Sequence, residues 1–485
     1  MNLAFLQDFG PIGILVLGAA ACSWLDLGQA RGDWGRRAPS RWVALAALLL
    51  AFLASIGFWH SSFGPNPPDV EHGSFLIYRF ALFFYAVGLA AAGAVVLCGA
   101  DAEVEVAPHT GVYHALLLMA TAGVLFTASA ADLISLAVGL ALTSLPLAIA
   151  QGLSKTNLTA LRTATRSLTL GGALLLAFIG GEAIVAGLSG TTSLSSIARQ
   201  SLPVDPLMGL AALLLVVGAL GQLGVFPFGG WRALELERTP LAAGTARTVL
   251  PALAAMAALL RLLPGALGAM PQDWTVTVSV VAALTLVVAP ILALRERRLL
   301  RAVQLLVVAQ VALCLLDLLD VSKPATASLL YLLLSLVPIA AATLGLWGAL
   351  RGAGEEDTKV ALRGLWARTP WLAGMLALLV AAAAGLPPLA GFFVRIFSVE
   401  AALRAGFGWL ALVALVSGVV GVLVAYRWVM VIFDARVDGP EIVLPGRVAL
   451  VGVVLCGVSF LGFVVAMGPL LGIATRAALP PLFGP

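Results

Sequence analysis

The stretch AGLPPLAGFFVR, residues 384–395, lies inside a long apolar run that has the composition of a membrane-spanning helix. Pro387, Pro388 and Gly391 interrupt this run, and Arg395 follows directly. Broken backbone at membrane depth is tolerated only where protein or water satisfies the freed polar groups, and such breaks are typical of ion and substrate paths. A second apolar run, LGQLGVFPFGGW at residues 220–231, is interrupted in the same way, by Pro227, Gly229 and Gly230.

The composition of the whole chain supports a membrane protein. Of its 485 residues, 61% are hydrophobic and 11% are charged, and the mean hydropathy is +1.05. Apolar runs of about 20 residues recur from end to end, which is the length that crosses about 30 Å of hydrocarbon as a helix. This composition excludes a water-soluble globular protein. It predicts an all-α, polytopic membrane bundle of about 14 transmembrane helices in contact with the lipid bilayer.

Basic residues are distributed unequally between the two alternating sets of loops. One set holds about 19 of them, whereas the opposite set and the tails hold about five. Lysine and arginine accumulate in cytoplasmic loops, so both termini are predicted to be periplasmic, in the inner membrane of a bacterium. One loop of the cytoplasmic set, ADAEVEVAPHT at residues 100–110, is acidic instead. We attribute the net charge of +4 to this orientation signal, and expect no nucleic-acid partner. The basic residues of the cytoplasmic set are Arg31, Arg36, Arg37, Arg41, Lys155, Arg162, Arg166, Arg232, Arg238, Arg295, Arg297, Arg298, Arg301, Arg351, Lys359, Arg363, Arg368, Arg436 and Arg447.

The two interrupted runs lie about 160 residues apart and divide the chain into similar halves. Two inverted repeats, each with one broken helix, are typical of secondary transporters. We therefore predict helices 1–3 in residues 1–110, a first repeat of helices 4–8 in residues 111–262, and a second repeat of helices 9–13 in residues 276–433. Helix 14 and a tail occupy residues 447–485. The broken helices are numbers 7 and 12.

Several ionisable residues fall inside the predicted spans. An intramembrane charge is a candidate functional group, although a charge near the end of a span can reach water instead. Arg247 and Arg395 lie beside the helix breaks and are the strongest candidates. The others are Glu182, Arg261, Asp317 and Arg427. The four cysteines lie far apart and the four histidines lie in or near loops, so neither a metal site nor a catalytic pairing is expected.

Four runs of the chain resemble the antiporter-like subunits of respiratory complex I, most closely the subunit N type. They are HALLLMATAGVLFTASAADLISLAVGLALTSLPLAIAQGL (114–153), GTTSLSSIA (190–198), LGVFPFGGW (223–231) and AGLPPLAGFFVRIFSVEAAL (384–403). The resemblance implies a proton-translocating module that lies beside other membrane-arm subunits. It implies no cofactor and no catalytic site in this chain, with NADH, flavin, iron–sulfur clusters and quinone elsewhere in the complex.

The chain departs from the family at the positions that relay protons. Ala141 stands in place of the family's fifth-helix glutamate, Gln222 and Ala252 in place of two lysines, and Arg395 in place of a third. The chain has only three lysines, all expected in loops. Arginine keeps its proton at neutral pH, and Gln and Ala have none to exchange. We therefore predict a degenerate module that is structural or weakly conducting. The remaining candidates for a proton path are Arg395, Arg166, Arg247, Gln222 and Glu182.

Two alternatives stay open. Subunits of Mrp-type antiporters and of membrane-bound hydrogenases share the same motifs, so the parent complex could be one of these. The chain could also be an independent secondary transporter in which Arg395 and Arg247 bind an anionic substrate.

Overall fold

The structure is a computed structural model that describes residues 10–30, 39–62, 70–72, 75–106, 109–153, 158–200, 206–235, 238–268, 271–320, 322–350, 362–434 and 446–477. The basic loop residues Arg31, Arg36, Arg37, Lys155, Arg351, Lys359 and Arg436 lie outside these ranges, as do the ends of the chain.

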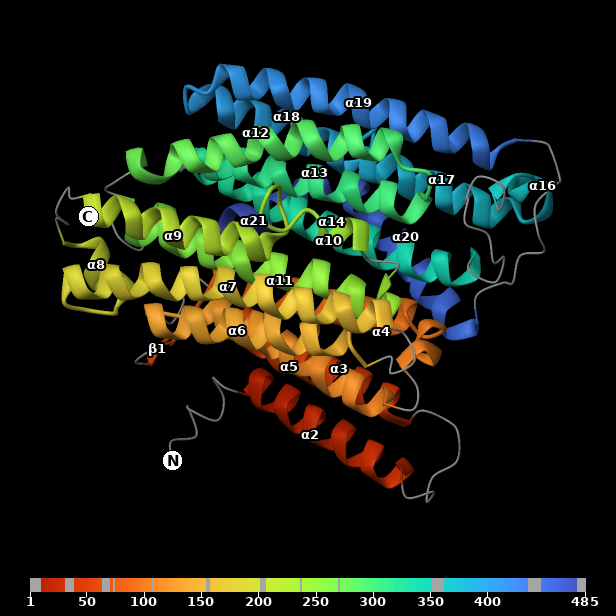
Figure 1. Cartoon of the computed structure of the whole chain (residues 1–485), viewed down its shortest axis with the longest axis horizontal. Coiled ribbons are helices and arrows are strands. Elements are labelled where there is room, and N and C mark those ends of the chain that lie inside the picture. Colours follow the sequence, from red (N-terminus) through yellow and green to blue (C-terminus); the bar gives the residue numbers. More distant parts are fainter. Residues whose placement is uncertain are drawn as a thin grey trace.

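Helices account for almost all of the described chain (Figure 1). In chain order the elements are α2 (Gly10–Ala30), α3 (Pro39–Ser62), β1 (Val70–His72), β2 (Phe75–Ile77), α4 (Arg79–Cys98), η1 (Ala102–Val106), α5 (Thr110–Ser129), α6 (Leu133–Ala150), α7 (Leu158–Ser189), α8 (Leu194–Ala198), α9 (Pro206–Leu223), α10 (Arg232–Glu235), α11 (Leu241–Arg261), η3 (Leu262–Ala266), α12 (Pro271–Arg295), α13 (Leu299–Leu319), α14 (Lys323–Leu350), α16 (Leu365–Arg368), α17 (Pro370–Ala384), α18 (Ala390–Arg404), α19 (Gly408–Ile432), α20 (Arg447–Val465) and α21 (Met467–Ala477).

Thirteen of the described helices are long and apolar enough to cross a membrane, so the protein is a multi-pass membrane protein. Helices α17 and α18 have 15 residues each, or about 22 Å, which is too short to cross about 30 Å of hydrocarbon singly. Together they would supply a fourteenth crossing. The exact count and the inverted relation of the two halves stay predictions.

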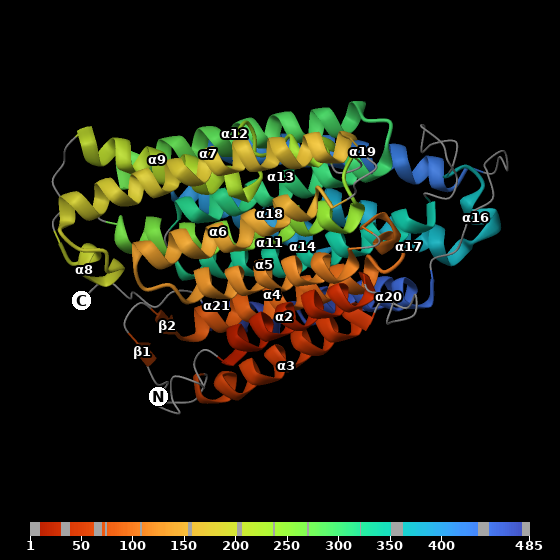
Figure 2. The same ribbon diagram turned by 60° about the horizontal axis from the view of Figure 1, so that its bottom comes forward.

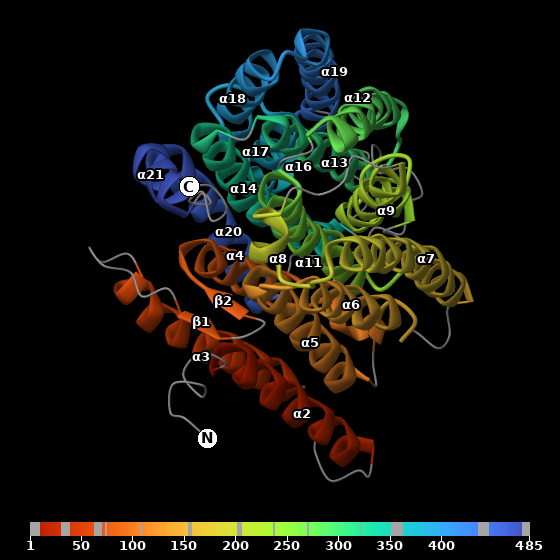
Figure 3. The ribbon, with the colours of Figure 1, turned by 90° about the vertical axis from the view of Figure 1, so that its left-hand side faces the viewer.

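The long helices run side by side, with α11, α13 and α14 at the centre and α2, α3 and α19 at the edges (Figure 3). Alanine-rich sequence on α11, ALAAMAALL, lets neighbouring backbones approach closely. On α19 the exposed residues Leu412, Val416, Val419 and Leu423 follow the helical repeat and form one apolar stripe. An apolar stripe of this kind is compatible with a surrounding bilayer or with a neighbouring membrane subunit.

The connections lie at two opposite ends of the bundle. Strands β1 and β2 and the short helix α8 lie at one end, and α16 lies at the other (Figure 2). This placement agrees with the alternation of the two sets of loops in the sequence. Lys323, which we expected in a loop, is the first residue of α14. The C-terminal span is divided, because α20 ends at Val465 and α21 begins at Met467.

The chain leaves the helical conformation at both interrupted runs. Helix α9 ends at Leu223 and α10 begins at Arg232, while α17 ends at Ala384 and α18 begins at Ala390. Each break contains a cis peptide bond, Phe226–Pro227 in the first and Pro387–Pro388 in the second.

A side chain from a neighbouring helix satisfies backbone groups at each break. At the first, the Thr285 hydroxyl on α12 accepts from Phe226 N at 3.1 Å and lies 3.2 Å from Phe226 O, to which it can donate. At the second, the Gln310 amide on α13 donates to Ala383 O at 3.2 Å. These contacts supply the protein partners that broken backbone needs in a membrane.

Candidate functional site

Gln222 and Arg232 form a polar pair at the first helix break. The Gln222 side-chain amide donates to Gly171 O on α7 at 3.1 Å, and Arg232 Nη1 donates to Gln222 O at 3.1 Å. Only 7% of Arg232 is exposed, although the sequence placed it in a loop. It is the functional candidate that the sequence reasoning missed. The signal that could have revealed it is its position directly after the break.

Arg166 joins this region through an aromatic ring. Its guanidinium carbon lies 4.5 Å from the centroid of the Trp231 ring, a cation–π distance. Trp231 also donates its indole N–H to Phe228 O at 3.1 Å, which fixes the ring. Arg166 belongs to α7, which begins at Leu158 and ends at Ser189.

Arg247 on α11 is almost completely enclosed, with 1% of its surface exposed. Its Nε and Nη1 atoms have no hydrogen-bond acceptor among the described residues. A Cβ atom at Gly171 would lie 3.0 Å from Arg247 Nη2, so the glycine leaves the room that this guanidinium needs. The structure therefore brings Arg247 and Gln222 to the same glycine of α7.

A cavity of about 60 Å³ lies next to this group, between α9, α10, α11, α13 and α14. Arg232, Gln304 and Thr248 line it together with mostly apolar residues. Ala252, for which the sequence comparison above predicts a lost relay position, also lines it.

Arg395 lies apart, on α18 in the second half of the bundle, and is 7% exposed. Its guanidinium packs against Gly418 of α19, where a Cβ atom would collide with it. One turn further along α18, the Ser398 hydroxyl donates to Asp317 Oδ2 on α13 at 3.0 Å. Asp317 is 1% exposed and does not reach water from the end of its span.

Glu182 lies away from the Arg247 group. Glu182 is 11 residues beyond Gly171 on α7, or about 16 Å along the helix. It is 5% exposed, and its Oε1 atom has no partner among the residues that the structure describes. Ala141 is partly buried on α6. The predicted proton-path residues therefore do not form one continuous group.

Two other intramembrane arginines donate hydrogen bonds to backbone carbonyls at helix ends. Arg261 at the end of α11 donates from Nη1 to Ala130 O at 2.6 Å and from Nε to Ala128 O at 3.1 Å. Its guanidinium also lies over the rings of Tyr78 and Phe80. Arg261 thus satisfies carbonyls that are left open where α5 ends. Arg427 donates to the carbonyls of Leu294 and Glu296, where α12 ends.

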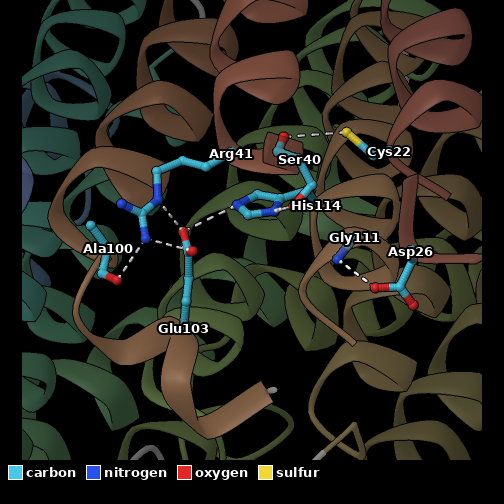
Figure 4. A network of polar contacts seen from close by, with 8 residues as sticks. All are labelled: Cys22, Asp26, Ser40, Arg41, Ala100, Glu103, Gly111 and His114. Carbon is cyan, nitrogen blue, oxygen red and sulfur yellow. Dashed lines mark hydrogen bonds and ion pairs between the residues drawn. The ribbon is translucent and has the colours of Figure 1, made fainter. Parts of the chain in front are cut away.

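The acidic loop that opposed the charge rule contains a buried ion pair (Figure 4). Glu103 on η1 accepts from Arg41 Nε at 2.9 Å and from Arg41 Nη2 at 2.7 Å, and Arg41 Nη2 also donates to Ala100 O at 3.0 Å. His114 Nε2 lies 3.2 Å from the same carboxylate, and His114 Nδ1 lies 3.2 Å from the Ser40 hydroxyl. His114 is fully buried in α5 and does not lie in a loop.

This network joins α2, α3, η1 and α5. Burial by itself would raise the pKa of the Glu103 carboxyl, but its contacts with His114 and Arg41 outweigh burial and hold that pKa below its ordinary value. Beside it, Asp26 of α2 accepts from Gly111 N at 3.0 Å. Two of the loop's carboxylates thus bind groups of neighbouring elements, because Asp101 also accepts from Gly446 N at 2.7 Å.

Known proteins similar to this chain cover nearly its whole length. It is 30% identical over 413 residues to a protein named NADH-quinone oxidoreductase subunit N of Geobacillus kaustophilus, with 82% of each chain covered. It is 27% identical over 450 residues to the protein of the same name from Rhodobacter capsulatus, with 91% of each covered. A chain of respiratory complex I from Thermus thermophilus has the same fold, with a TM-score of 0.74, 22% identity, and coverage of 96% of this chain and 99% of that chain.

A family model described as "NADH:quinone oxidoreductase/Mrp antiporter, TM" matches residues 130–421, which is more than half of the chain. The matched segment includes both helix breaks, and with them Gln222, Arg247 and Arg395. The chain therefore belongs to the family of NADH:quinone oxidoreductase and Mrp antiporter transmembrane subunits.

Proposed function

We propose that the chain is the membrane-arm subunit N of a complex I-like NADH-quinone oxidoreductase. The observation that carries the proposal is the match to curated subunit N proteins over 82–91% of both lengths, with no large part of either left over. The family alone also includes Mrp antiporters, so the length-wide match to subunit N is what favours complex I. In this role NADH, flavin, iron–sulfur clusters and quinone are bound by other subunits.

The orientation belongs to the same proposal. The protein lies in the inner membrane of a bacterium with both termini in the periplasm, as the distribution of basic residues indicates. The ends occupied by β1, β2 and α8 are then periplasmic, and the end occupied by α16 is cytoplasmic. The Arg41–Glu103 ion pair lies on the cytoplasmic side.

We further infer that this subunit carries no complete proton relay of its own. Four observations support this. Ala141 and Ala252 have no proton to exchange, the Gln222 amide donates to a backbone carbonyl, and Arg395 lacks a carboxylate partner among the described residues. A relay needs groups that bind and release protons near the working pH, which arginine does not do. The subunit then seals and holds the membrane arm.

Isolation of the native complex tests the identity. With an affinity tag on this chain, we expect other membrane-arm subunits and an NADH-oxidising, quinone-reducing activity to co-purify. Sodium–proton antiporter subunits without NADH oxidation would support the Mrp-type alternative. Transport of an anionic substrate by the purified chain alone, abolished in Arg395→Gln and Arg247→Gln variants, would support the independent transporter.

A further inference from the structure

A groove of about 260 Å³ lies between α4, α14 and α20, three helices that contact one another side by side (Figure 3). The small residues Ala90 and Gly93 of α4 line it, and a Cβ atom added at Gly93 would meet no neighbouring atom within 4 Å. Leu455 and Ser459 of α20 also line it and are exposed. The groove is therefore open to the outside of the bundle.

The groove follows the helices over about the depth of one lipid leaflet. On α20 it extends from Gly452 to Phe463, a rise of about 16 Å, and on α4 it extends from Leu97 back to Val87, or about 15 Å. The hydrocarbon of a bilayer is about 30 Å thick, so one leaflet contributes about 15 Å. One end of the groove, at Leu97 and Gly452, lies beside the last turn of α4 and near the start of α20.

The lining decides what can occupy this space. Apart from the Cys456 thiol and the Ser459 hydroxyl, the described residues that line the groove are apolar. An ordered water needs about two to four polar partners, and apolar cavities stay dry. A helix of a neighbouring subunit is about 10–12 Å wide, which is too wide for a gap between three helices that touch one another. A single hydrocarbon chain meets both restrictions.

An arginine lies on the same face of α20, beyond the end of the groove. Arg447 is the first residue of α20 and lies about two turns before Leu455, with Val451 between them at the same four-residue spacing. Arg447 is exposed, and its side chain has neither an ion pair nor a hydrogen bond with another described residue. The Asp101 carboxylate, which accepts from Gly446 N, adds one negative charge nearby. These two charges complement a headgroup that carries both a phosphate and an amine.

We propose that the groove binds one acyl chain of a phosphatidylethanolamine molecule whose phosphate contacts Arg447. The acyl chain covers the apolar lining, and the phosphate supplies the negative partner that Arg447 lacks among the described residues. From Arg447 to Gly452 is about 8 Å along the helix, which leaves room for the glycerol between the phosphate and the chain. Only the identity of the leaflet, the cytoplasmic one, rests on the proposed function.

Photo-crosslinking of a lipid tests this site. The protein is purified through a tag, together with the subunits that accompany it, and is reconstituted in vesicles of phosphatidylethanolamine. A small part of this lipid carries a diazirine in one acyl chain, and after irradiation the lipid-bearing peptides are identified by mass spectrometry. We expect label on residues 452–463. The label does not depend on activity, whereas a failure of the proposed function would appear as a lack of co-purified NADH oxidation.

Matched variants separate the groove from ordinary contact with the bilayer. Gly93→Leu fills the groove from α4 and should remove most of the label on residues 452–463. Gly209→Leu on α9, where an added Cβ atom also meets nothing within 4 Å, is the control and should leave the label unchanged. Arg447→Gln should reduce the label about fivefold, since one arginine near the membrane surface contributes about that much to lipid binding.

Two results would overturn the proposal. Absence of label on residues 452–463 of the natural protein would show that a neighbouring subunit covers the groove. Equal label in the natural protein and in the assembled Gly93→Leu or Arg447→Gln protein would show ordinary contact with the bilayer. If Gly93→Leu prevents assembly, Arg447→Gln carries the test, because its side chain lies at the surface and outside the packed core.

Discussion

Replacing Glu103 by glutamine removes the charge of the buried network while keeping its shape. Arg41 would keep its hydrogen bonds to Ala100 O and to one side-chain oxygen of residue 103. The second carboxylate oxygen would be replaced by an amide NH₂ group, which is a donor facing the guanidinium donor of Arg41. The His114 ring would lose its carboxylate neighbour. The expected result is a looser attachment of α3 to η1 and α5.

The magnitude follows from the burial of the partners. Removing one partner of a fully buried ion pair costs about 3–5 kcal/mol, and a hydrogen bond to a charged group is worth about 1.5–3 kcal/mol. The side chains of Arg41 and Glu103 are 19% and 5% exposed, so water compensates part of the loss at Arg41. We expect Glu103→Gln to lower the free energy of unfolding by about 2–3 kcal/mol at pH 7.

A double-mutant cycle with Arg41→Gln measures the interaction itself. Unfolding of the purified protein in mild detergent is followed by circular dichroism for the natural protein, the two single variants and the double variant. We expect a coupling energy of about 1–2 kcal/mol. Additive single variants, with coupling below about 0.5 kcal/mol, would refute the reasoning that the pair stabilises the protein.

The same variant predicts a pH dependence. The folded-state pKa of Glu103 lies below its unfolded value of about 4.3. The stabilisation by its ionised form is then fully present above about pH 4.3 and is lost as pH falls through the folded-state pKa. The difference between the natural protein and Glu103→Gln should stay constant from pH 8 to about pH 5 and shrink below it. A difference that already falls between pH 7 and pH 6 would contradict this assignment.

Three further predictions concern the helix break, the relay and the topology. Thr285→Val should lower the free energy of unfolding by about 1–2 kcal/mol, because the buried Phe226 N loses its acceptor, whereas the exposed Thr475→Val should not; equal losses would exclude Thr285 as a support of the break. Restoring the family's relay residues should raise the number of protons pumped per NADH oxidised by the whole complex. If the natural complex already pumps with the full family stoichiometry and Arg395→Ala lowers it, this subunit is not silent. Fusions of each terminus to a reporter that is active only in the periplasm should be active, and a cytoplasmic C-terminus would contradict the predicted orientation. The relay substitutions are Ala141→Glu, Gln222→Lys, Ala252→Lys and Arg395→Lys.

The spans and breaks could be predicted from sequence because they depend on local composition. A run of about 20 apolar residues has few alternatives to a membrane helix, and the prolines at 227, 387 and 388 cannot continue one without loss. The C-terminal span was predicted as one helix, although Pro469 cannot donate to Val465 O and α20 ends at that residue. The start of α7 at Leu158 is not marked by hydropathy, because Arg162 and Arg166 lie in its first three turns and the helix extends past the apolar segment.

The partners of the charged residues could not be predicted, because they come from distant segments. Glu103 and Arg41 are 62 residues apart, and Arg261 is more than 130 residues from the carbonyls that it binds. A rule that counts charges by loop treats Glu103 as an exception and Arg232 as an ordinary loop residue. Glu103 is paired with Arg41, which belongs to a loop of the same set, and Arg232 is enclosed by the helix bundle.

The position of Arg232 connects the loss of the relay with the survival of the cavity. Ala252 and Arg232 line the same cavity, so a positively charged residue lies beside the position for which we propose a lost lysine. The lysine of a relay gives up its proton when its surroundings change, and the charge of the site then switches. An arginine keeps its charge through the same change. A permanent cation beside the cavity repels an incoming proton, an effect that is stronger at the low dielectric of a bundle core than in water. If Ala252 stands at a lost lysine position, as we propose, the neighbouring Arg232 keeps a positive charge beside the cavity but does not switch it, which is the physical reason to expect a subunit that holds the membrane arm without conducting.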